Sequence, residues 1–325
     1  MIVLVTGGAG YIGSVVADQL IRHGHQVVVL DNLAQGHRQA VPEAAKLVEA
    51  DICGQQVLDR VLGSLHIDAV MHMAAETVVA RSNSDPKRFF HTNVVGSINL
   101  LDAMLKHDVH KLILSSTAAV YGDPHADVIR EDHPTNPINA YGRSKLMFEQ
   151  ILHSYGEAYG MSHLSLRYFN AAGATGSLGE DHDPETHLIP NILRAALDNK
   201  PVTVFGTDYP TVDGTCVRDY IHVIDIARAH VVALERLDTL NGKAYNLGNQ
   251  KGYSVIEVIE TAKKVTGVNL SVKVGPRRSG DPATLVAGSD RASAELGWKP
   301  QLHELESMIE SAWGWMSRHP HGYTY

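Results

Sequence analysis

The first residues of the chain join a short apolar run to a glycine-rich turn. Residues 2–5 are apolar, residues 7–13 read Gly-Gly-Ala-Gly-Tyr-Ile-Gly, and residues 14–23 have a helical pattern. A strand, a glycine turn and a helix in this order are the setting in which such a turn binds the pyrophosphate of a dinucleotide. A tight turn at the start of an ordinary α/β domain is the simpler interpretation, but it does not account for the acidic residue that follows.

The glycines and that acid have separate tasks in a dinucleotide site. Gly10 lets the backbone approach a pyrophosphate, and Gly13 lets the helix pack closely on the strand. A second buried strand is predicted at residues 27–30 and ends at Asp31, 18 residues after Gly13. A carboxylate at this spacing accepts hydrogen bonds from ribose hydroxyls and repels a 2′-phosphate, so the sequence predicts NAD as cofactor in preference to NADP.

Strand and helix patterns alternate through the first half of the chain, which predicts an α/β fold of the Rossmann type with a doubly wound parallel sheet. The predicted strands are residues 2–5, 27–30, 46–49, 69–72, 111–115 and 163–167, and the predicted helices are residues 14–23, 56–63, 87–107 and 144–159. Ligands of such sheets bind at the carboxyl ends of the strands.

The pattern changes after residue 172, where glycine, proline and acidic residues become frequent. We predict an NAD-binding domain at residues 1–172 and a smaller α+β substrate lobe at 173–325, with residues 223–248 packing back on the first domain. The short strands predicted here are residues 202–205, 244–247 and 271–274, and the helices are residues 223–237, 255–266 and 303–317.

Three polar residues form a candidate catalytic group. Tyr141 and Lys145 lie four residues apart, on one face of a helix, and Thr117 lies 24 residues upstream at the end of an apolar run. A lysine ammonium favours the phenolate of a nearby tyrosine, whose unperturbed pKa is about 10. Alone, this pair would indicate a solvated helix face; beside a dinucleotide site it indicates a general base.

The composition of the chain limits its possible binding partners and the cellular compartment in which we expect it. The 325 residues carry a formal net charge of −8 and no basic block, so neither nucleic acid nor an anionic membrane is an expected partner. The only cysteines are Cys53 and Cys216, and no apolar run reaches the roughly 18 residues of a membrane span. With no signal peptide ahead of the first strand, we expect a cytoplasmic protein with free thiols. The 19 histidines show no metal-binding spacing, so no metal is expected.

The segments that contain these motifs resemble a known group. The sequence is similar to the extended short-chain dehydrogenase/reductases, and within them to the UDP-glucose 4-epimerases of galactose metabolism. The similarity runs almost from end to end, through residues 6–13, 30–33, 115–122, 141–145, 166–173, 205–222, 245–248, 276–282 and 317–320.

The resemblance implies roles for residues at the matching positions. Thr117, Tyr141 and Lys145 would be catalytic. The cofactor would contact Gly7, Gly10, Tyr11, Ile12, Gly13, Asp31, Asn32, Asp51, Ile52, Met73, Ala74, Asn93, Ser115, Tyr141, Lys145 and Tyr168. The UDP-sugar substrate would contact Thr117, Asn170, His187, Leu188, Phe205, Arg218, Tyr220, Arg278 and Asp281.

The implied reaction interconverts UDP-glucose and UDP-galactose. Tyr141 would take the proton of the sugar 4-hydroxyl while C4 gives a hydride to NAD, and hydride would return to the opposite face of the transient 4-keto sugar. Arg218 and Arg278 would anchor the diphosphate meanwhile, unless Arg278 is simply paired with Asp281 at the surface. The long helices at residues 87–107 and 144–159 resemble the paired interface of a homodimer.

Other activities remain open at this point. A 4-epimerase of UDP-N-acetylglucosamine, UDP-glucuronate or a pentose is the main alternative, since Leu285 matches a pocket-gating position that decides sugar size but is equally compatible with a core residue. Thr77 and His187 also depart from the commonest family residues. A dehydratase or decarboxylase is disfavoured because Ala118 and Ala119, which follow Thr117, cannot move a proton. A non-enzymatic NAD sensor is disfavoured because the catalytic trio is intact.

Overall fold

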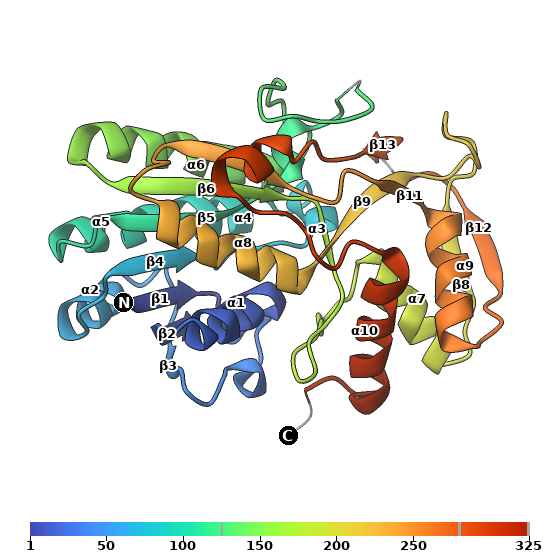
Figure 1. Cartoon of the computed structure of the whole chain (residues 1–325), viewed down its shortest axis with the longest axis horizontal. Helices are drawn as coiled ribbons and strands as arrows, with labels where there is room; N and C mark the ends of the chain where they lie inside the picture. The colour runs from blue at the N-terminus through green and yellow to red at the C-terminus, as the bar shows by residue number, and fades with distance from the viewer. Residues whose placement is uncertain (125, 279–280, 324–325) are drawn as a thin grey trace.

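A parallel sheet of seven strands forms the centre of the molecule in the computed structural model, which describes residues 1–124, 126–278 and 281–323. Its strands are β1 (Ile2–Thr6), β2 (Gln26–Asp31), β3 (Lys46–Glu49), β4 (Ala69–His72), β5 (Lys111–Thr117), β6 (Ser162–Tyr168) and β10 (Lys243–Leu247). They lie in the order β10-β6-β5-β4-β1-β2-β3, and every neighbouring pair is parallel (Figure 1). The predicted α/β fold with a parallel sheet is confirmed.

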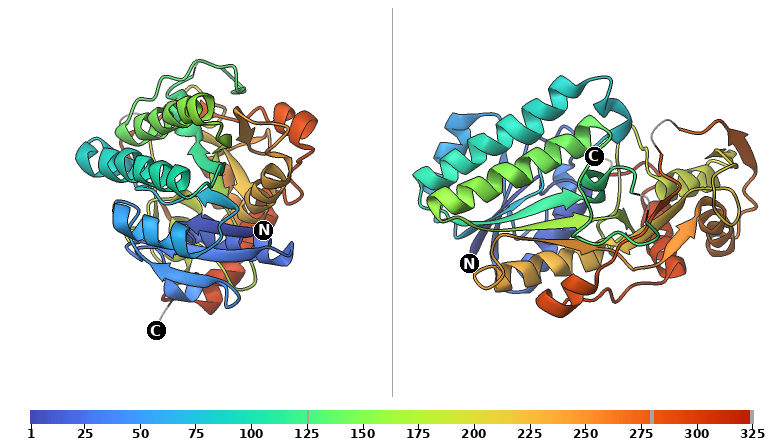
Figure 2. Two further views of the ribbon diagram at one scale, coloured as in Figure 1. Left: turned by 90° about the vertical axis from the view of Figure 1, so that its left-hand side faces the viewer. Right: turned by 90° about the horizontal axis from the view of Figure 1, so that it is seen from above.

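Helices cover both faces of this sheet because its strands alternate apolar side chains between the two faces. Val3 and Val5 of β1 pack in one core with α1 (Tyr11–Arg22) and α8 (Val223–Arg236), whereas Leu4 packs in the other. That second core is formed with α2 (Gln55–Ser64), α5 (Ser97–Lys106) and α6 (Ala140–Tyr159). In the right-hand view of Figure 2, α5 and α6 lie side by side on the face opposite α8.

Helices α1 and α6 begin earlier in the sequence than predicted. Helix α1 begins at Tyr11 and not at residue 14, and α6 begins at Ala140 and not at residue 144. The Asn139 side chain starts α6 by accepting a hydrogen bond from the Gly142 N–H at 2.8 Å, a helix-capping contact. As a result Tyr141 lies in the first turn of α6. The helix predicted at residues 87–107 is one helical run made of α4 (Pro86–Phe90), a π-helical segment at His91–Gly96, and α5.

A second region lies at one end of the sheet (Figure 1) and has its own apolar core. It contains β7 (Asn170–Ala172), α7 (Leu188–Leu197), β8 (Val202–Phe205), β9 (Val217–His222), β11 (Gly252–Ser254), α9 (Val255–Thr266), β12 (Val272–Gly275), β13 (Thr284–Leu285) and α10 (Leu305–Arg318). Shorter elements are α3 (Val79–Ser82), helical turns at Arg38–Ala40 and Ala118–Tyr121, and a π-helical turn at Ala292–Leu296. The domain division at residue 172 stays a prediction.

The sequence analysis missed α7 and β9. Strand β9 is difficult to predict because Arg218 and Asp219 interrupt its apolar pattern. Asp219 is fully buried, and its carboxylate accepts hydrogen bonds from the backbone N–H groups of Asn249, Gln250 and Ala287. These three donors tie β9 to the segments that follow β10 and β13. Among the described residues, no helix is both long and apolar enough to span a membrane.

Glycine at position 13 allows α1 to lie directly against the turn that follows β1. A Cβ atom at Gly13 would lie 2.1 Å from the Gly7 carbonyl oxygen and 2.9 Å from the Gly8 Cα. Both obstacles are backbone atoms, so a side chain here would force the helix away from the turn.

We therefore expect Gly13→Ala to lower the free energy of unfolding by about 1–3 kcal/mol. Gly314 in α10 is the matched control, because a Cβ there meets no atom within 4 Å. Gly314→Ala should be neutral or stabilise the protein by up to about 1 kcal/mol. Urea unfolding of the two variants measures the difference, and equal stabilities would contradict the close packing of α1.

Candidate active site

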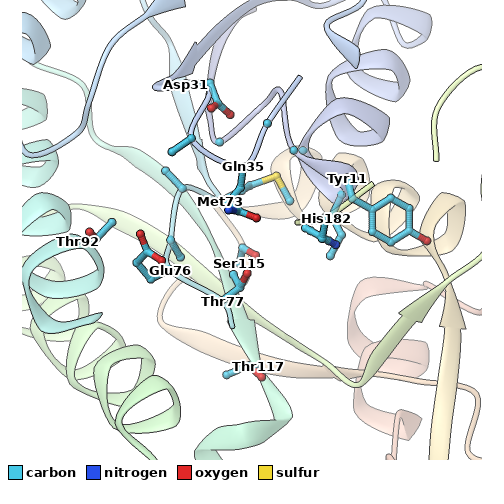
Figure 3. A pocket seen from close by; sticks show the side chains of 18 of the residues that line it. Tyr11, Asp31, Gln35, Met73, Glu76, Thr77, Thr92, Ser115, Thr117 and His182 are labelled. Carbon is cyan, nitrogen blue, oxygen red and sulfur yellow. The ribbon is translucent and has the colours of Figure 1, made fainter. Parts of the chain in front are cut away.

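A pocket of about 350 Å³ opens at the carboxyl ends of the central strands (Figure 3). This is the edge at which a doubly wound sheet binds its ligands. The pocket brings together fifteen of the sixteen residues predicted to contact the cofactor, all except Asn93, and all three predicted catalytic residues. The other lining residues are Leu30, Ala34, Gln35, Gly36, Ala50, Ala75, Glu76, Thr77, Val79, Thr92, Phe169, Asn170, Ala171, Glu180, His182 and His187.

The glycine turn forms one end of this pocket. Gly7 has a φ of +73°, and a Cβ there would lie 2.6 Å from the Ala74 amide nitrogen, so only glycine fits. Asp31 at the end of β2 faces the turn, and its carboxylate accepts hydrogen bonds from the N–H groups of Ala9 (3.0 Å) and Leu33 (2.8 Å). Burial raises the pKa of Asp31, and these two hydrogen bonds oppose the shift. The turn therefore presents backbone N–H groups and a fixed carboxylate to the same space.

Buried hydrogen bonds hold the middle of the pocket beneath its lining. His72 at the end of β4 bridges the hydroxyls of Thr6 and Ser97, each at 2.8 Å, and burial lowers its pKa to about 3. Asn93 lies behind the lining. Its carbonyl oxygen accepts a hydrogen bond from the Glu76 N–H (2.7 Å), and its amide donates to the Ser144 hydroxyl (2.9 Å). Asn93 thus positions the pocket wall and the first turns of α6.

The candidate catalytic residues come from β5 and α6. Ser115 and Thr117 alternate along β5, so both face the pocket, while Ser116 between them contacts Glu149 on the other face. Lys145 is buried, and its ammonium donates to the Ser115 carbonyl oxygen at 2.9 Å. The Tyr168 hydroxyl is hydrogen-bonded to the Ser115 hydroxyl. Ser115, Thr117, Lys145 and Tyr168 therefore line the same pocket as Tyr141.

The electrostatics of Tyr141 differ from the sequence-based expectation. We expected Lys145 to lower the pKa of the Tyr141 phenol. Instead, burial raises this pKa above 10, and the hydrogen bond with Thr117 opposes the shift. The Lys145 ammonium donates to the Ser115 carbonyl, and burial lowers its own pKa to about 8 despite the nearby Glu149 carboxylate.

A buried network supports the two catalytic elements from behind. Arg167 of β6 donates to both carboxylate oxygens of Glu149 on α6, at 3.0 and 2.5 Å, and to the Tyr121 hydroxyl at 2.9 Å. Tyr121 in turn donates to the Asn246 side chain at 2.7 Å. The side chains of Arg167 and Glu149 are each only 9% exposed, and such a bidentate pair fixes α6 against the sheet.

A cluster of two glutamates and two histidines at the pocket edge was not predicted. We call it the 180–187 cluster; it consists of Glu180, His182, Glu185 and His187. Burial opposes ionisation of His182, but hydrogen bonds to Glu180 and Glu185 outweigh it and raise the His182 pKa to about 9. Hydrogen bonds to His182 and His187 lower the pKa of Glu185 to about 2, against burial. The repeated Glu-x-His spacing in residues 180–187 was the available sequence signal, but the two histidines there are five residues apart, which matches no common metal-binding motif.

The predicted substrate residues divide into two groups. Thr117, Asn170 and His187 line the pocket, whereas Leu188, Phe205, Arg218, Tyr220, Arg278 and Asp281 lie outside its lining, in the second region. Arg218 is paired with Asp281 at 3.2 Å, and the Arg278 guanidinium lies 4.2 Å from the centre of the Phe205 ring. The Arg278–Asp281 pair considered from the sequence is therefore replaced by Arg218–Asp281. Residues 279 and 280 lie outside the described residues.

Tyr220 and Leu285 have mainly apolar surroundings. Tyr220 is buried in the core of the second region, and Leu188 packs against the same core. Leu285 packs against the small core that contains Ala118, which follows Thr117, and Phe169, which lines the pocket. Leu285 thus contacts the wall of the pocket without lining it.

Comparison with known proteins identifies the family of the chain. Residues 3–248 match the model of the NAD dependent epimerase/dehydratase family. The chain belongs to this family. A UDP-glucose 4-epimerase of Halalkalibacterium halodurans is 50% identical over 329 aligned residues, which cover 100% of this chain and 98% of the relative. The family membership expected from the sequence is confirmed.

Solved structures agree with the observed fold of this family member. A crystal structure of a UDP-glucose 4-epimerase superposes with a TM-score of 0.97 at 45% identity, with 100% of both chains covered. The UDP-glucose 4-epimerase from Bifidobacterium longum in complex with NAD+ and UDP has a TM-score of 0.95 at 38% identity, covering 99% of this chain and 100% of that one.

Proposed function

We propose that the protein is an NAD-dependent 4-epimerase that interconverts UDP-glucose and UDP-galactose. One observation carries the proposal: Thr117, Tyr141 and Lys145 line the same pocket as the glycine turn and Asp31. A dinucleotide bound at the turn would therefore share this space with the candidate base. Full-length relatives with the same activity in their names support the choice of sugar nucleotide.

The residues of the pocket fit NAD. Gly7, Gly10 and Gly13 leave the backbone open to a pyrophosphate at the N-terminus of α1, which favours anions. The Asp31 carboxylate is placed to accept hydrogen bonds from ribose hydroxyls and to repel a 2′-phosphate. When bound, NAD supplies a reversible hydride acceptor for C4 of the sugar. Lys145 and Tyr168, on the far side of the pocket, would border its nicotinamide end.

Tyr141 is the proposed general base. As a phenolate it accepts the proton of the sugar 4-hydroxyl, and later it returns that proton to the 4-oxygen, so the residue is regenerated. Its pKa is raised by burial, and thus the phenolate requires stabilisation. The Thr117 hydroxyl provides part of it and can hydrogen-bond the same sugar oxygen. A cationic nicotinamide ring nearby would provide more, which would couple proton removal to the presence of the oxidised cofactor.

Inversion at C4 requires the sugar to turn over while the nucleotide stays bound. We assign the anchoring to the second region, where Arg218 and Arg278 carry guanidinium groups that can grip phosphate oxygens bidentately. Asp281 orients the Arg218 guanidinium, and Phe205 supports that of Arg278. Leu285 would limit the space for substituents at the sugar by its contact with Phe169. UDP-glucose and UDP-galactose are therefore the proposed substrates, with N-acetyl and uronic forms as the alternatives to test.

Product analysis tests the proposal directly. Purified protein is incubated separately with UDP-galactose, UDP-N-acetylgalactosamine and UDP-glucuronate, without added cofactor, and the products are separated. We expect UDP-glucose from UDP-galactose. Tyr141→Phe should reduce turnover by about 10²–10⁴-fold because the base is removed. Tyr159→Phe, at the exposed end of α6, is the matched control. Normal turnover by the Tyr141 variant, or no conversion of any UDP-sugar by the native protein, would refute the assignment.

The pH dependence of the reaction tests the role of Thr117. Since the phenolate is the active form, kcat/KM should rise with pH up to the pKa of Tyr141. Thr117 lowers this pKa, so Thr117→Val should move the rise to higher pH. Thr117→Ser retains the hydroxyl and should follow the native profile. Profiles for UDP-galactose measure the shift, and a Val variant that lost activity equally at every pH would contradict the pKa argument.

We also propose a homodimer formed through α6 and the helical run from α4 to α5, in a cytoplasmic enzyme. Val95 and Met147 are large apolar side chains that are more than 40% exposed on these two neighbouring segments. A surface of this kind on paired helices suits burial against a second copy.

Met147→Glu should convert the dimer to a 35.4 kDa monomer, because an unpaired carboxylate would be buried at the interface. Val212→Glu changes an exposed residue in the second region and should leave the mass unchanged. Light scattering at micromolar concentration measures both, and a native protein that is monomeric would contradict the proposal.

A further inference from the structure

We propose that the 180–187 cluster binds one divalent transition-metal ion of the zinc class, which fastens the loop before α7 over the cofactor pocket. This departs from the expectation that the histidines are not metal ligands. It requires only residues present in the chain, and it does not depend on the proposed catalytic activity.

The geometry is close to that of a four-coordinate site. One ligand atom from each of the four residues lies within 4.8 Å of the others. The His187 Nδ1 lies 2.7 Å from Glu180 and 2.9 Å from Glu185, and the His182 Nδ1 lies 3.1 and 3.6 Å from the same two carboxylates. A tetrahedral zinc ion with bonds near 2.0–2.1 Å needs ligand atoms about 3.4 Å apart. Adjustments of less than about 1 Å would bring each of these four pairs to that separation.

The donor set selects a class of metal. Two imidazole nitrogens and two carboxylate oxygens suit Zn²⁺ and its neighbours, whereas Ca²⁺ and Mg²⁺ prefer sites made of oxygen alone. Two carboxylates would also balance the charge of a divalent cation. Four protein ligands leave no open position, which is typical of a structural ion, not a catalytic one.

Hydrogen bonds other than those among the four side chains also position the ligands. One Glu185 carboxylate oxygen accepts hydrogen bonds from the backbone N–H groups of Thr186 and His187, both at 2.7 Å. The loop itself is held at Asp181, whose carboxylate accepts from the Tyr323 N–H (2.9 Å) and whose carbonyl is bonded to His37 (2.9 Å). Such outer contacts reduce the ordering that a metal must impose, and they are a regular feature of metal sites.

The place of the cluster suggests what the metal would do. Glu180, His182 and His187 line the pocket, and the His182 ring lies edge-on to Tyr11, 6.4 Å between centroids, at the start of α1 (Figure 3). The Tyr11 hydroxyl donates to the Gly173 carbonyl at 2.6 Å, where the same loop begins. An ion held here would link Glu180 and His182 to Glu185 and His187 within the loop that precedes α7 and lines the pocket. The His187 side chain is half exposed, which leaves a path for the ion to enter.

The competing arrangement is a pair of protonated histidines bonded to two carboxylates, which needs no metal. The two arrangements differ in metal content, so the test measures metal directly. Purified protein is stripped with a chelator, dialysed, exposed to Zn²⁺ and passed through a desalting column, and the retained zinc is counted by mass spectrometry. We expect one zinc ion per chain. Co²⁺ in place of zinc should give the intense visible absorption of a tetrahedral site.

Variants locate the ion. His182→Gln and Glu185→Gln should each weaken zinc affinity by about 100-fold or more, since each removes a ligand. His153→Gln is the matched control, because it removes an exposed histidine–glutamate pair of 3.4 Å on α6 and should retain the ion. If the native protein keeps no zinc, or if both cluster variants bind zinc as tightly as the His153 variant, the site does not exist. The zinc content of the native protein tests the proposal even if a cluster variant fails to fold.

Discussion

The contact between α1 and the turn after β1 is the constraint on which the rest of the site depends. Gly13 lies so close to Gly7 and Gly8 that no side chain fits between the helix and the turn. The contact aims the free N–H groups at the start of α1 into the pocket. It also fixes the position of Tyr11, whose hydroxyl donates a hydrogen bond to the Gly173 carbonyl. One backbone-to-backbone contact therefore sets both the anion-binding end of the pocket and the position of the loop above it.

The opposite end of the pocket is governed by desolvation. Tyr141, Lys145 and Tyr168 all have pKa values that burial shifts toward the neutral form. A network of neutral hydroxyls and one lysine bonded to a backbone carbonyl is a resting arrangement, in which no group is a strong base. Under the proposed mechanism, proton removal by the Tyr141 phenol requires a positive charge brought close to it. The mechanism therefore requires that Tyr141 share one cavity with the glycine turn, although it lies 128 residues after Gly13.

The parts that could be predicted are those in which the local pattern and the tertiary contact agree. Strands such as β1 and β5 are short apolar runs that end in polar residues, so both their location and their pocket-facing ends followed from the sequence. Strand β9 could not be predicted, because a buried carboxylate interrupts its apolar pattern. The hydrogen bonds that make the burial of Asp219 possible come from backbone N–H groups of segments distant in sequence. The 180–187 cluster was missed for a related reason: a loop without regular structure brings its side chains together. The hydrogen bond from Lys145 to the Ser115 carbonyl could not be predicted, because a sequence does not show which backbone groups lie beside a side chain.

The early start of α6 has an electrical consequence. Because Asn139 caps the helix, Tyr141 occupies the first turn, where the aligned peptide dipoles leave about half a positive charge. Side chains in helices generally lean toward the N-terminus, the end at which this partial positive charge lies. A charge of this size is worth about 0.3–1 kcal/mol to a nearby anion. The helix itself thus offsets part of the penalty that the apolar surroundings impose on the phenolate, and it does so in every state of the protein.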